Sequence, residues 1–362
     1  MLVHICCSVD SHFFLERLRR EFPNEELVGF FYDPNIHPYS EYRLRLLDVQ
    51  RSCQKLGIPL IEGEYDYENW LKAVRGLENE PEKGERCMVC FDKRLKVAAQ
   101  KAKELGHKRY TTTLLVSPLK SQEQLKRSGA EVDAELGTEF VFVDYRSGGG
   151  TQEQARVTKE QKLYRQDYCG CLFGLSQQRA SQEVIMDEMI EPVTRQILPG
   201  SIEERLKMYE RRIRLEEEGI DYHILRHRFL NYRLLRGFVR VKKKVVPSYI
   251  FSYSLLRRDY AKARVDFVEN GVGYANRDEI RIIDLAKLNT YLKEPCESVK
   301  ELYFKGLAPE VEKEIKEALG MDFYDLSPLI VLDKIPTKFE VYIYATTYKD
   351  VREKLLIKER NA

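Results

Sequence analysis

Short apolar runs alternate with stretches of helical spacing through residues 1–145, and this alternation constrains the fold more than any other feature of the chain. The runs that predict strands are residues 2–7, 27–32, 60–62, 109–113 and 140–143. The stretches that predict helices are residues 11–22, 40–56, 67–77, 89–105 and 122–136. Strands that alternate with helices favour a doubly wound, mostly parallel sheet with right-handed crossovers. The predicted fold class is therefore α/β, with ligands expected outside the carboxyl ends of the strands.

The second half of the chain carries more mixed signals. A helical pattern runs from Cys171 to about residue 189, and the loop 192–200, which contains two prolines, marks a domain boundary. The elements expected beyond it are a charged helix over 202–219, a hairpin over 265–274 with its turn at 269–271, a helix over 311–319, a strand over 339–345 and a closing helix over 348–358. We therefore expect two domains, residues 1–190 with the parallel sheet and residues 200–362 with a mixed α+β fold.

Composition excludes several classes of protein. A content of 43% hydrophobic and 33% charged residues is typical of a globular chain and not of a disordered one. The apolar opening is short, lacks a basic region and runs into Asp10, so it predicts a strand and not a signal peptide. No run approaches the roughly 18 apolar residues that a membrane span needs. We expect a cytoplasmic protein with no membrane partner.

Four of the eight cysteines stand in two tight pairs, Cys87–Cys90 and Cys169–Cys171. Paired thiolates in a reducing compartment indicate zinc or iron–sulfur chemistry more often than disulfides, and four sulfur ligands suit structural zinc and a four-iron cluster equally well. A redox disulfide between Cys87 and Cys90 is a further interpretation, but it would leave the second pair idle. Buried inert thiols are the remaining alternative. Cys53 and Cys296, which have no other cysteine nearby in the sequence, are interpreted as packing residues.

Cys6 and Cys7 follow the first predicted strand, with Asp10 three residues further on. Side chains alternate along a strand, so both thiols can act together only if the strand ends at this point. Asp10 could then be an oxygen ligand of a second metal or a general acid. The alternative places Cys6 in the core and Asp10 at the cap of the next helix. Because Thr113 and Asp144 also follow predicted strands, these side chains favour one shared site.

The segment 221–260 contains ten Lys or Arg residues and two acids, Asp221 and Asp259. The aromatic residues interleaved with them are Tyr222, Phe229, Tyr232, Phe238, Tyr249, Phe251 and Tyr253. Such a segment can neutralise phosphates while its rings stack on bases. The alternative is a solvated helix face whose aromatic residues lie in the core. RNA binding that involves Arg236 and Lys242 is the hypothesis that follows.

Several segments of residues 1–180 resemble the QueH-type epoxyqueuosine reductases, and they occur in the family's order. The first three are His4-Ile5-Cys6-Cys7-Ser8-Val9-Asp10-Ser11, Phe31-Tyr32-Asp33-Pro34-Asn35-Ile36-His37-Pro38 and Arg86-Cys87-Met88-Val89-Cys90. The last three are Thr112-Thr113-Leu114-Leu115-Val116-Ser117-Pro118, Asp144-Tyr145-Arg146 and Tyr164-Arg165-Gln166-Asp167-Tyr168-Cys169-Gly170-Cys171. Residues beyond about 190 are not part of the common pattern, so the resemblance implies nothing about the second domain.

The resemblance implies an iron–sulfur enzyme that removes the epoxide oxygen of epoxyqueuosine in tRNA, giving queuosine at the wobble position without cobalamin. It also implies a sheet like that of the nucleotide alpha-hydrolase or PP-loop proteins, which carry Ser-Gly-Gly-x-Asp-Ser after their first strand. Here Cys7 and Ser8 replace both glycines, so the backbone cannot easily approach a pyrophosphate, and ATP use is not expected.

The resemblance further implies that the clustered cysteines are iron ligands. We assign a [4Fe-4S] cluster to Cys87, Cys90, Cys169 and Cys171, and an additional iron to Cys6, Cys7 and Asp10; the division into four and three rests on the spacing.

Candidates for the acid that protonates the departing oxygen are Asp10, Tyr32, Asp33, His37 and Asp144. Tyr32 could equally be a core aromatic residue, and His37 a loop residue.

The partners expected are tRNA that carries epoxyqueuosine and an external electron donor, because the chain has no Gly-x-Gly-x-x-Gly fingerprint for a flavin or nicotinamide. Arg43 and Arg146 are candidates for phosphate contacts or ordinary surface residues. Two other functions remain open. One is a zinc-stabilised tRNA-binding or tRNA-thiolating protein with Cys6 or Cys7 as nucleophile. The other is a non-catalytic RNA-binding module with structural cysteines.

Overall fold

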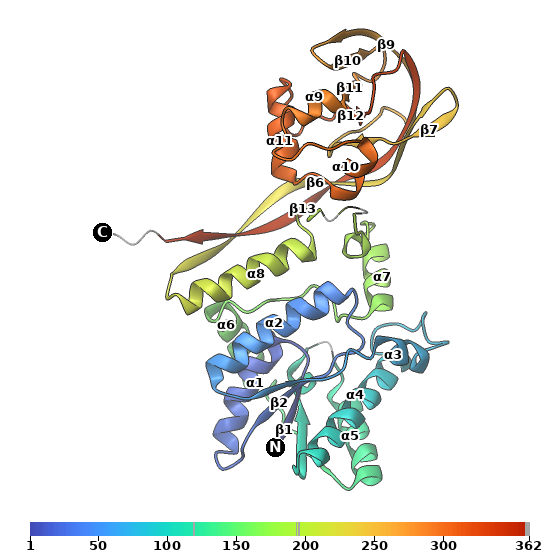
Figure 1. Ribbon diagram of the computed structural model, residues 1–362. Helices are drawn as coiled ribbons and strands as arrows, with labels where there is room; N and C mark the ends of the chain where they lie inside the picture. The colour runs from blue at the N-terminus through green and yellow to red at the C-terminus, as the bar shows by residue number, and fades with distance from the viewer. Residues whose placement is uncertain (119, 193, 195, 359–362) are drawn as a thin grey trace. The chain divides into compact units, whose positions relative to one another are not determined.

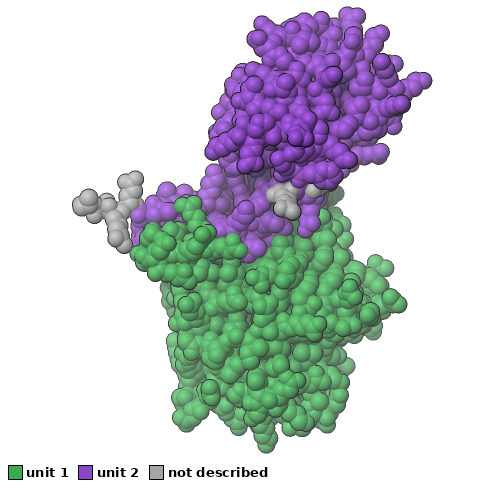
Figure 2. Space-filling view, viewed as in Figure 1, with its two compact units in different colours: residues 1–189, 209–220 green, residues 190–208, 221–362 purple. Residues whose placement is uncertain are grey.

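The computed structural model describes residues 1–118, 120–192, 194 and 196–358, which form two compact units (Figure 2). The first unit consists of Met1–Met189 with Tyr209–Ile220, and the second consists of Ile190–Met208 with the described residues from Asp221 on. The predicted boundaries, 1–190 and 200–362, would place residues 209–220 in the second domain, whereas their contacts assign them to the first unit. The roles predicted for the two domains stay predictions.

A five-stranded parallel sheet is the centre of the first unit (Figure 1). Its strands are β1 (Leu2–Ile5), β2 (Val28–Phe31), β3 (Leu60–Glu62), β4 (Arg109–Thr112) and β5 (Glu139–Phe140), in the order β3-β2-β1-β4-β5. Every pairing is parallel, and the central strand β1 is completely buried. This confirms a parallel α/β sheet, while its assignment to the PP-loop fold stays a prediction.

The helices of the first unit agree with the predicted pattern in position but differ at their ends. They are α1 (Ser8–Glu21), α2 (Tyr39–Leu56), α3 (Tyr67–Ala73), α4 (Glu85–Glu104), α5 (Gln122–Leu136), α6 (Gly150–Glu160) and α7 (Leu172–Ser181), with 3-10 turns η1 (Thr113–Val116) and η2 (Asp187–Met189). Helix α4 begins before the predicted residue 89, so Cys87 and Cys90 both lie inside it. The helix expected to run to residue 189 ends at Ser181, and α6 was not predicted.

The second unit has an eight-stranded mixed sheet in the order β7-β6-β13-β9-β10-β11-β12-β8. Its strands are β6 (Tyr222–Val241), β7 (Lys244–Val246), β8 (Tyr249–Ile250), β9 (Tyr260–Glu269), β10 (Val272–Ala275), β11 (Arg281–Asp284), β12 (Leu329–Leu332) and β13 (Lys338–Ile357). The β11–β12 pair is parallel and the other pairs are antiparallel. Helices α9 (Leu285–Asn289), α10 (Val299–Lys305) and α11 (Pro309–Ala318) complete the unit, and α8 (Ile202–Glu217) precedes β6. A second, mixed α+β unit is therefore present.

The hairpin predicted over 265–274 and the closing helix predicted over 348–358 both lie in the second unit. The hairpin is confirmed: β9 and β10 pair with Glu269 opposite Val272, and Asn270 and Gly271 adopt φ values of 50° and 78° in the turn. The closing helix over 348–358 is wrong, because β13 continues as a strand to Ile357, opposite Tyr222 of β6. Pairing along a second long strand outweighs the helix propensity of that charged segment.

Among the described residues, no helix combines the length and the apolar character needed to cross a membrane.

Candidate metal centre

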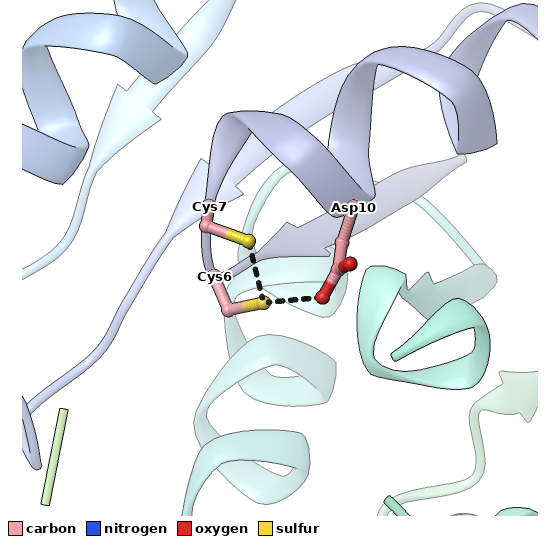
Figure 3. Close-up of side chains that lie close together, drawn as sticks. All are labelled: Cys6, Cys7 and Asp10. Atoms are coloured by element: carbon pink, nitrogen blue, oxygen red, sulfur yellow. Dashed lines mark hydrogen bonds between the residues drawn. The ribbon is translucent and has the colours of Figure 1, made fainter. Parts of the chain in front are cut away.

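The turn between β1 and α1 brings Cys6, Cys7 and Asp10 together (Figure 3). Strand β1 ends at Ile5, Cys7 is the N-cap residue of α1, and Asp10 lies in the first turn of that helix. The Cys6 Sγ lies 3.8 Å from the Cys7 Sγ and 3.6 Å from Asp10 Oδ2, and the three ligand atoms fall within 4.8 Å of one another. The strand thus ends where joint action of the two thiols requires. The alternative in which Asp10 caps the helix is wrong.

All three of these side chains are buried, and burial and contacts within the cluster shift the pKa values of Asp10 and Cys7. Burial raises the pKa of Asp10, although hydrogen bonds from the two thiols and from Gln154 oppose the rise; Gln154 Nε2 donates to Asp10 Oδ1 at 2.8 Å. The hydrogen bond with Cys6 and burial raise the pKa of Cys7. Two thiols and a carboxyl in one buried cluster would repel one another as anions unless a cation joined them. The donor set therefore fits a metal ion.

Buried ion pairs hold this turn to the neighbouring helices. The hydroxyl of Ser8, next to Cys7, donates to Asp48 Oδ2 at 2.5 Å, and the backbone N–H of Tyr164 donates to the same oxygen at 2.7 Å. The other carboxylate oxygen of Asp48 lies 3.6 Å from Arg51 and 3.4 Å from Arg212. Helices α1, α2 and α8 therefore meet at one buried carboxylate, which fixes the helix start that carries the thiols.

The second group of cysteines lies at the N-terminal ends of two helices. Cys87 and Cys90 occupy the first turns of α4, and Cys171 is the N-cap residue of α7. The backbone N–H of Lys83 donates to the Cys87 Sγ at 3.3 Å. Free N–H groups and the helix dipole at these ends stabilise thiolates. Local structure thus prepares this group of sulfurs for metal binding.

Packing brings Cys90, Cys169 and Cys171 together around Trp70, while Cys87 packs against the core of the parallel sheet. Cys90 and Cys171 are buried in one cluster with Trp70, and Cys169 packs against it. Gly170 has a φ of +103°, and a Cβ there would lie 2.7 Å from the Ile36 side chain, so the turn requires glycine. A hydrogen bond from Cys171 lowers the pKa of Cys169, and the same bond raises the pKa of Cys171.

Two cations, the buried Arg94 and the partly buried Lys120, lie beside the cysteines: Arg94 interacts with both groups, and Lys120 interacts with the second group and with Asp10. Burial lowers the pKa of Arg94, but Asp33, Cys90 and Cys6 more than offset this and raise it. Burial also lowers the pKa of Lys120, and Cys169, Glu82, Cys87 and Cys90 raise it above its ordinary value. Arg94 pairs directly with the carboxylate of Asp33. Negative charge on the sulfurs is therefore compensated from two sides.

A cavity of about 290 Å³ joins the two groups. Cys6 and Asp10 line it from the first group, Cys169 lines it from the second, and Arg94 and Lys120 complete this part of the wall. The Thr113 hydroxyl lies 3.6 Å from the Cys6 Sγ, at the carboxyl end of β4. The cavity thus opens where a doubly wound sheet places its ligands. Its mixed polar and apolar wall is suited to a small organic group.

Of the predicted acids, Tyr32, His37 and Asp144 are absent from the described residues that line this cavity. Tyr32 is buried, stacks on Phe30 with 5.9 Å between ring centroids and directs its hydroxyl to Asp66 at 3.4 Å, as expected of a core aromatic residue. His37 stacks on Tyr67 at 4.6 Å, and its backbone N–H donates to the Gly170 carbonyl at 2.9 Å. Its contacts support the Cys169–Cys171 turn.

Asp144 is exposed, and its surroundings hold it ionised. Hydrogen bonds from the Ser147 hydroxyl, the Gln122 amide and the Arg146 backbone N–H lower the pKa of Asp144 to about 2. A carboxylate with this pKa is ionised at neutral pH, and the role of Asp144 as a proton donor stays a prediction. The guanidinium of Arg146 donates to the backbone carbonyls of Lys120 and Leu114, and it therefore supports the loop that carries Lys120. Arg43 is exposed and lies 4.0 Å from Glu62.

Three residues of the site, Arg94, Lys120 and Gln154, were not predicted from the sequence. Arg94 follows Cys90 by one helical turn, and this spacing was a usable signal. Lys120 lies in a loop, and Gln154 lies on α6, a helix with few apolar residues, so neither could be distinguished from a surface residue. Asp33, which was weighed as an acid, is instead the buried partner of Arg94, and burial raises its pKa to about 6.

Comparison with known proteins gives consistent matches. The family model described as "Epoxyqueuosine reductase QueH" matches residues 1–177. A protein of that name from Helicobacter pylori is 40% identical over 350 residues, covering 92% of this chain and 94% of the relative. A protein of that name from Histophilus somni is 38% identical, and the match covers 48% of this chain and 72% of the relative. Another from Thermotoga maritima is 36% identical, and the match covers 49% of this chain and 92% of the relative. The second unit is thus included in the Helicobacter pylori match but not in the family model.

Among solved structures, one similar chain is the U34-tRNA thiolase NcsA from Methanococcus maripaludis with its [4Fe-4S] cluster. It is 12% identical with a TM-score of 0.24, and the match covers 52% of this chain and 75% of that one. A likeness of this size carries no argument about function. The family match and the relative that spans nearly the whole chain lead to one conclusion: this chain belongs to the epoxyqueuosine reductase QueH family.

Proposed function

We propose that this protein is an iron–sulfur-dependent epoxyqueuosine reductase, which removes the epoxide oxygen of epoxyqueuosine in tRNA and leaves queuosine at the wobble position. The observation that carries the proposal is the cavity lined by Cys6, Asp10 and Cys169, in a chain whose relatives bear this activity in their names. The reaction breaks two C–O bonds and forms a C=C bond. It consumes two electrons and two protons and releases water, so an external electron donor is required.

We assign Cys87, Cys90, Cys169 and Cys171 to a [4Fe-4S] cluster, and Cys6, Cys7 and Asp10 to one additional iron. A four-iron cluster supplies single electrons, and an iron with an open coordination position polarises a C–O bond. The protein's part is to bind and orient the nucleoside in the cavity and to limit its contact with water. Arg94 and Lys120 place two fixed positive charges beside the sulfurs, which reduces the electrostatic cost when electrons arrive.

The roles of the remaining parts follow from this assignment. The first unit would be the catalytic unit, because it contains the cavity and seven of the eight cysteines, and the second unit would contribute to tRNA binding. Among the residues predicted to donate a proton, Asp10 is the one placed in the cavity wall. His37 acts through the Gly170 turn as a positioning residue.

The experiment that tests the proposal measures iron, zinc and acid-labile sulfide in anaerobically prepared protein, together with turnover of tRNA that carries epoxyqueuosine. We expect about four or five irons per chain with sulfide in the wild type, and loss of sulfide and turnover in a Cys87→Ala/Cys169→Ala variant. A Cys6→Ala/Cys7→Ala variant should keep its sulfide and lose about one iron, because only the additional site is removed.

The matched control is Cys296→Ser, because Cys296 is a buried cysteine of the second unit with no role in the site. This variant should keep the metal content and turnover of the wild type. Zinc without sulfide in the wild-type protein would contradict the proposal and favour the zinc-stabilised tRNA-thiolating alternative.

A further inference from the structure

A row of three aromatic side chains crosses one face of the sheet in the second unit. Phe238 of β6, Tyr342 of β13 and Tyr260 of β9 are direct neighbours in the strand register. The ring centroids of Phe238 and Tyr342 lie 4.6 Å apart with an angle of 19° between the planes, and those of Tyr342 and Tyr260 lie 4.6 Å apart with the planes tilted by 41°. The three rings therefore form a continuous platform.

This platform does not belong to the hydrophobic core. Side chains alternate between the two faces of a strand, and the neighbours Val239, Val341 and Ala261 are buried on the opposite face. Tyr260 is 41% exposed, and Tyr344, two residues from Tyr342 on the same face, is 53% exposed. Core packing therefore does not account for a cluster of rings in these positions.

Basic side chains flank the rings on the same face. The Arg236 guanidinium lies 5.5 Å from the Phe238 ring, and that of Arg240 lies 5.2 Å from Phe238 and 5.4 Å from Tyr342. The same strand positions place three further basic residues on this face, Lys262, Arg264 and Lys338. The acidic residues beside them are Glu340, opposite Lys262 and Arg240, and Asp266, which pairs with Arg264 at 3.0 Å. The face is thus strongly positive around an aromatic centre.

We propose that this face, defined by Phe238, Tyr342 and Tyr260 with Arg236 and Arg240, binds unpaired nucleotides of RNA. Bases would stack on the rings while the arginines and lysines contact phosphates, the combination that single-stranded nucleic acids need. Bases inside a duplex are already stacked on each other and cannot lie flat on the rings, so the face favours a loop. That the RNA is tRNA rests on the proposed function; that the face binds unpaired RNA rests on its own geometry and charge.

The experiment measures the affinity of the anaerobically prepared full chain for two fluorescent RNAs, an anticodon stem-loop and a blunt duplex of equal length. In a Tyr260→Thr/Tyr342→Thr variant, where threonine keeps the preference for a strand, we expect affinity for the stem-loop to fall about tenfold or more. Affinity for the duplex should change much less. In an Arg236→Gln/Arg240→Gln variant, the slope of log affinity against log salt should become shallower by about one to two units.

The matched controls are Phe304→Ser on α10, an aromatic residue that is 61% exposed and not part of the row, and Lys313→Gln on α11. Both should bind the stem-loop as the wild type does. Circular dichroism of every variant verifies that the sheet is intact. If the tyrosine variant is folded and binds the stem-loop with wild-type affinity, the inference is overturned. It is likewise overturned if this variant loses as much affinity for the duplex as for the stem-loop.

The proposed function and the RNA-binding face can fail independently of each other. If the wild-type protein binds the stem-loop through the tyrosines but does not reduce epoxyqueuosine, the proposed function fails and the RNA-binding face stands. If it reduces epoxyqueuosine while the tyrosine variant binds and turns over like the wild type, the proposed function stands and the face is not an RNA site. Binding of an acidic protein in place of RNA would also overturn the inference.

Discussion

At the scale of single residues, burial decides which charges the protein can tolerate. Lys316 of α11 is fully buried in the second unit, where its ammonium donates to the carbonyls of Phe323 at 3.3 Å and Asp325 at 3.0 Å. Burial lowers the pKa of Lys316 to about 8, although Glu312 and two aspartates oppose the decrease. Two backbone carbonyls satisfy the donors without supplying a full negative charge. Lys316 therefore reduces the stability of the second unit while it is protonated.

In a Lys316→Met variant, the free energy of unfolding of the second unit should change less with pH in the alkaline range than it does in the wild type. Between about pH 8 and the ordinary lysine pKa of about 10.4, the unfolded chain binds more protons at this position than the folded chain, so wild-type stability rises with pH across that window. The difference between wild type and variant should change on the order of 2 kcal/mol between about pH 7 and pH 10.5. Urea unfolding followed by the near-ultraviolet circular dichroism of tyrosine measures it.

Lys313→Met is the control, because Lys313 lies on the same helix with its side chain 53% exposed. It should leave the pH dependence as in the wild type. An equal pH dependence in wild type and Lys316→Met would mean that the buried ammonium keeps an ordinary pKa.

At the scale of elements, a buried carboxylate couples three helices to the turn that carries Cys6 and Cys7. Asp48 of α2 accepts the Ser8 hydroxyl at the start of α1 and lies beside Arg212 of α8. Arg51 joins this network through Glu216, at 2.8 Å. The helix start at Ser8 thus depends on Asp48, 40 positions away, and on Arg212, more than two hundred positions away.

Asp48→Asn should destabilise the first unit by about 3 kcal/mol, because it leaves the buried Arg51 and Arg212 with Glu216 as the remaining carboxylate beside them. The urea midpoint of the first unit measures this, since Trp70 is the single tryptophan of the chain and is buried in that unit. We also expect the variant to hold less iron, because Ser8 loses its charged acceptor beside Cys7.

Glu135→Gln serves as the comparison, because it breaks the exposed pair of Glu135 and Lys96, which is worth about 0–1 kcal/mol. If Asp48→Asn lowered the midpoint no more than Glu135→Gln does, the network would not hold the turn.

At the scale of the whole molecule, the division between units does not follow a single cut in the chain. Helix α8 contributes Ile202–Met208 to the second unit and Tyr209–Glu217 to the first. The segment before it also belongs to the second unit, where Gln196 donates to the Tyr249 hydroxyl at 2.7 Å and Glu204 pairs with Arg352. The first unit therefore includes residues 209–220, which follow the loop at 192–200, and the second unit begins at Ile190, before that loop.

A fragment that ends at residue 220 should be more stable than one that ends at residue 199. The shorter fragment lacks Arg212 and Glu216, so Asp48 and Arg51 lose buried partners, and we expect its urea midpoint to be lower when Trp70 fluorescence is followed. The longer fragment with Arg212→Met is the control and should shift toward the shorter one. Equal midpoints for the two unmodified fragments would show that residues 209–220 are dispensable to the first unit.

Local patterns in the sequence determined much of the first unit. Apolar runs and helical spacing located its strands and most of its helices. This was possible because hydrophobic periodicity, and the ending of helices and strands at Gly and Pro, depend only on residues a few positions apart. The turn at 269–271 was equally local, since Asn and Gly accept positive φ. The paired cysteines and Asp10 were recognisable because ligands that lie close in the chain also lie close in space. The family could be named from these segments.

Contacts between distant segments decided the rest. Residues 348–358 have a helical pattern, but residues 348–357 form a strand, because β6 offers a partner along its whole length. In the basic segment 221–260, the fold buries Tyr222, Tyr232, Tyr249, Phe251 and Tyr253 and leaves Phe238 on the open face, where Tyr342 and Tyr260 join it. Sequence by itself determined which residue types were available and the local form of the chain. Tertiary structure alone decided which of them meet, because strand register and buried charge pairing depend on partners far away in the chain.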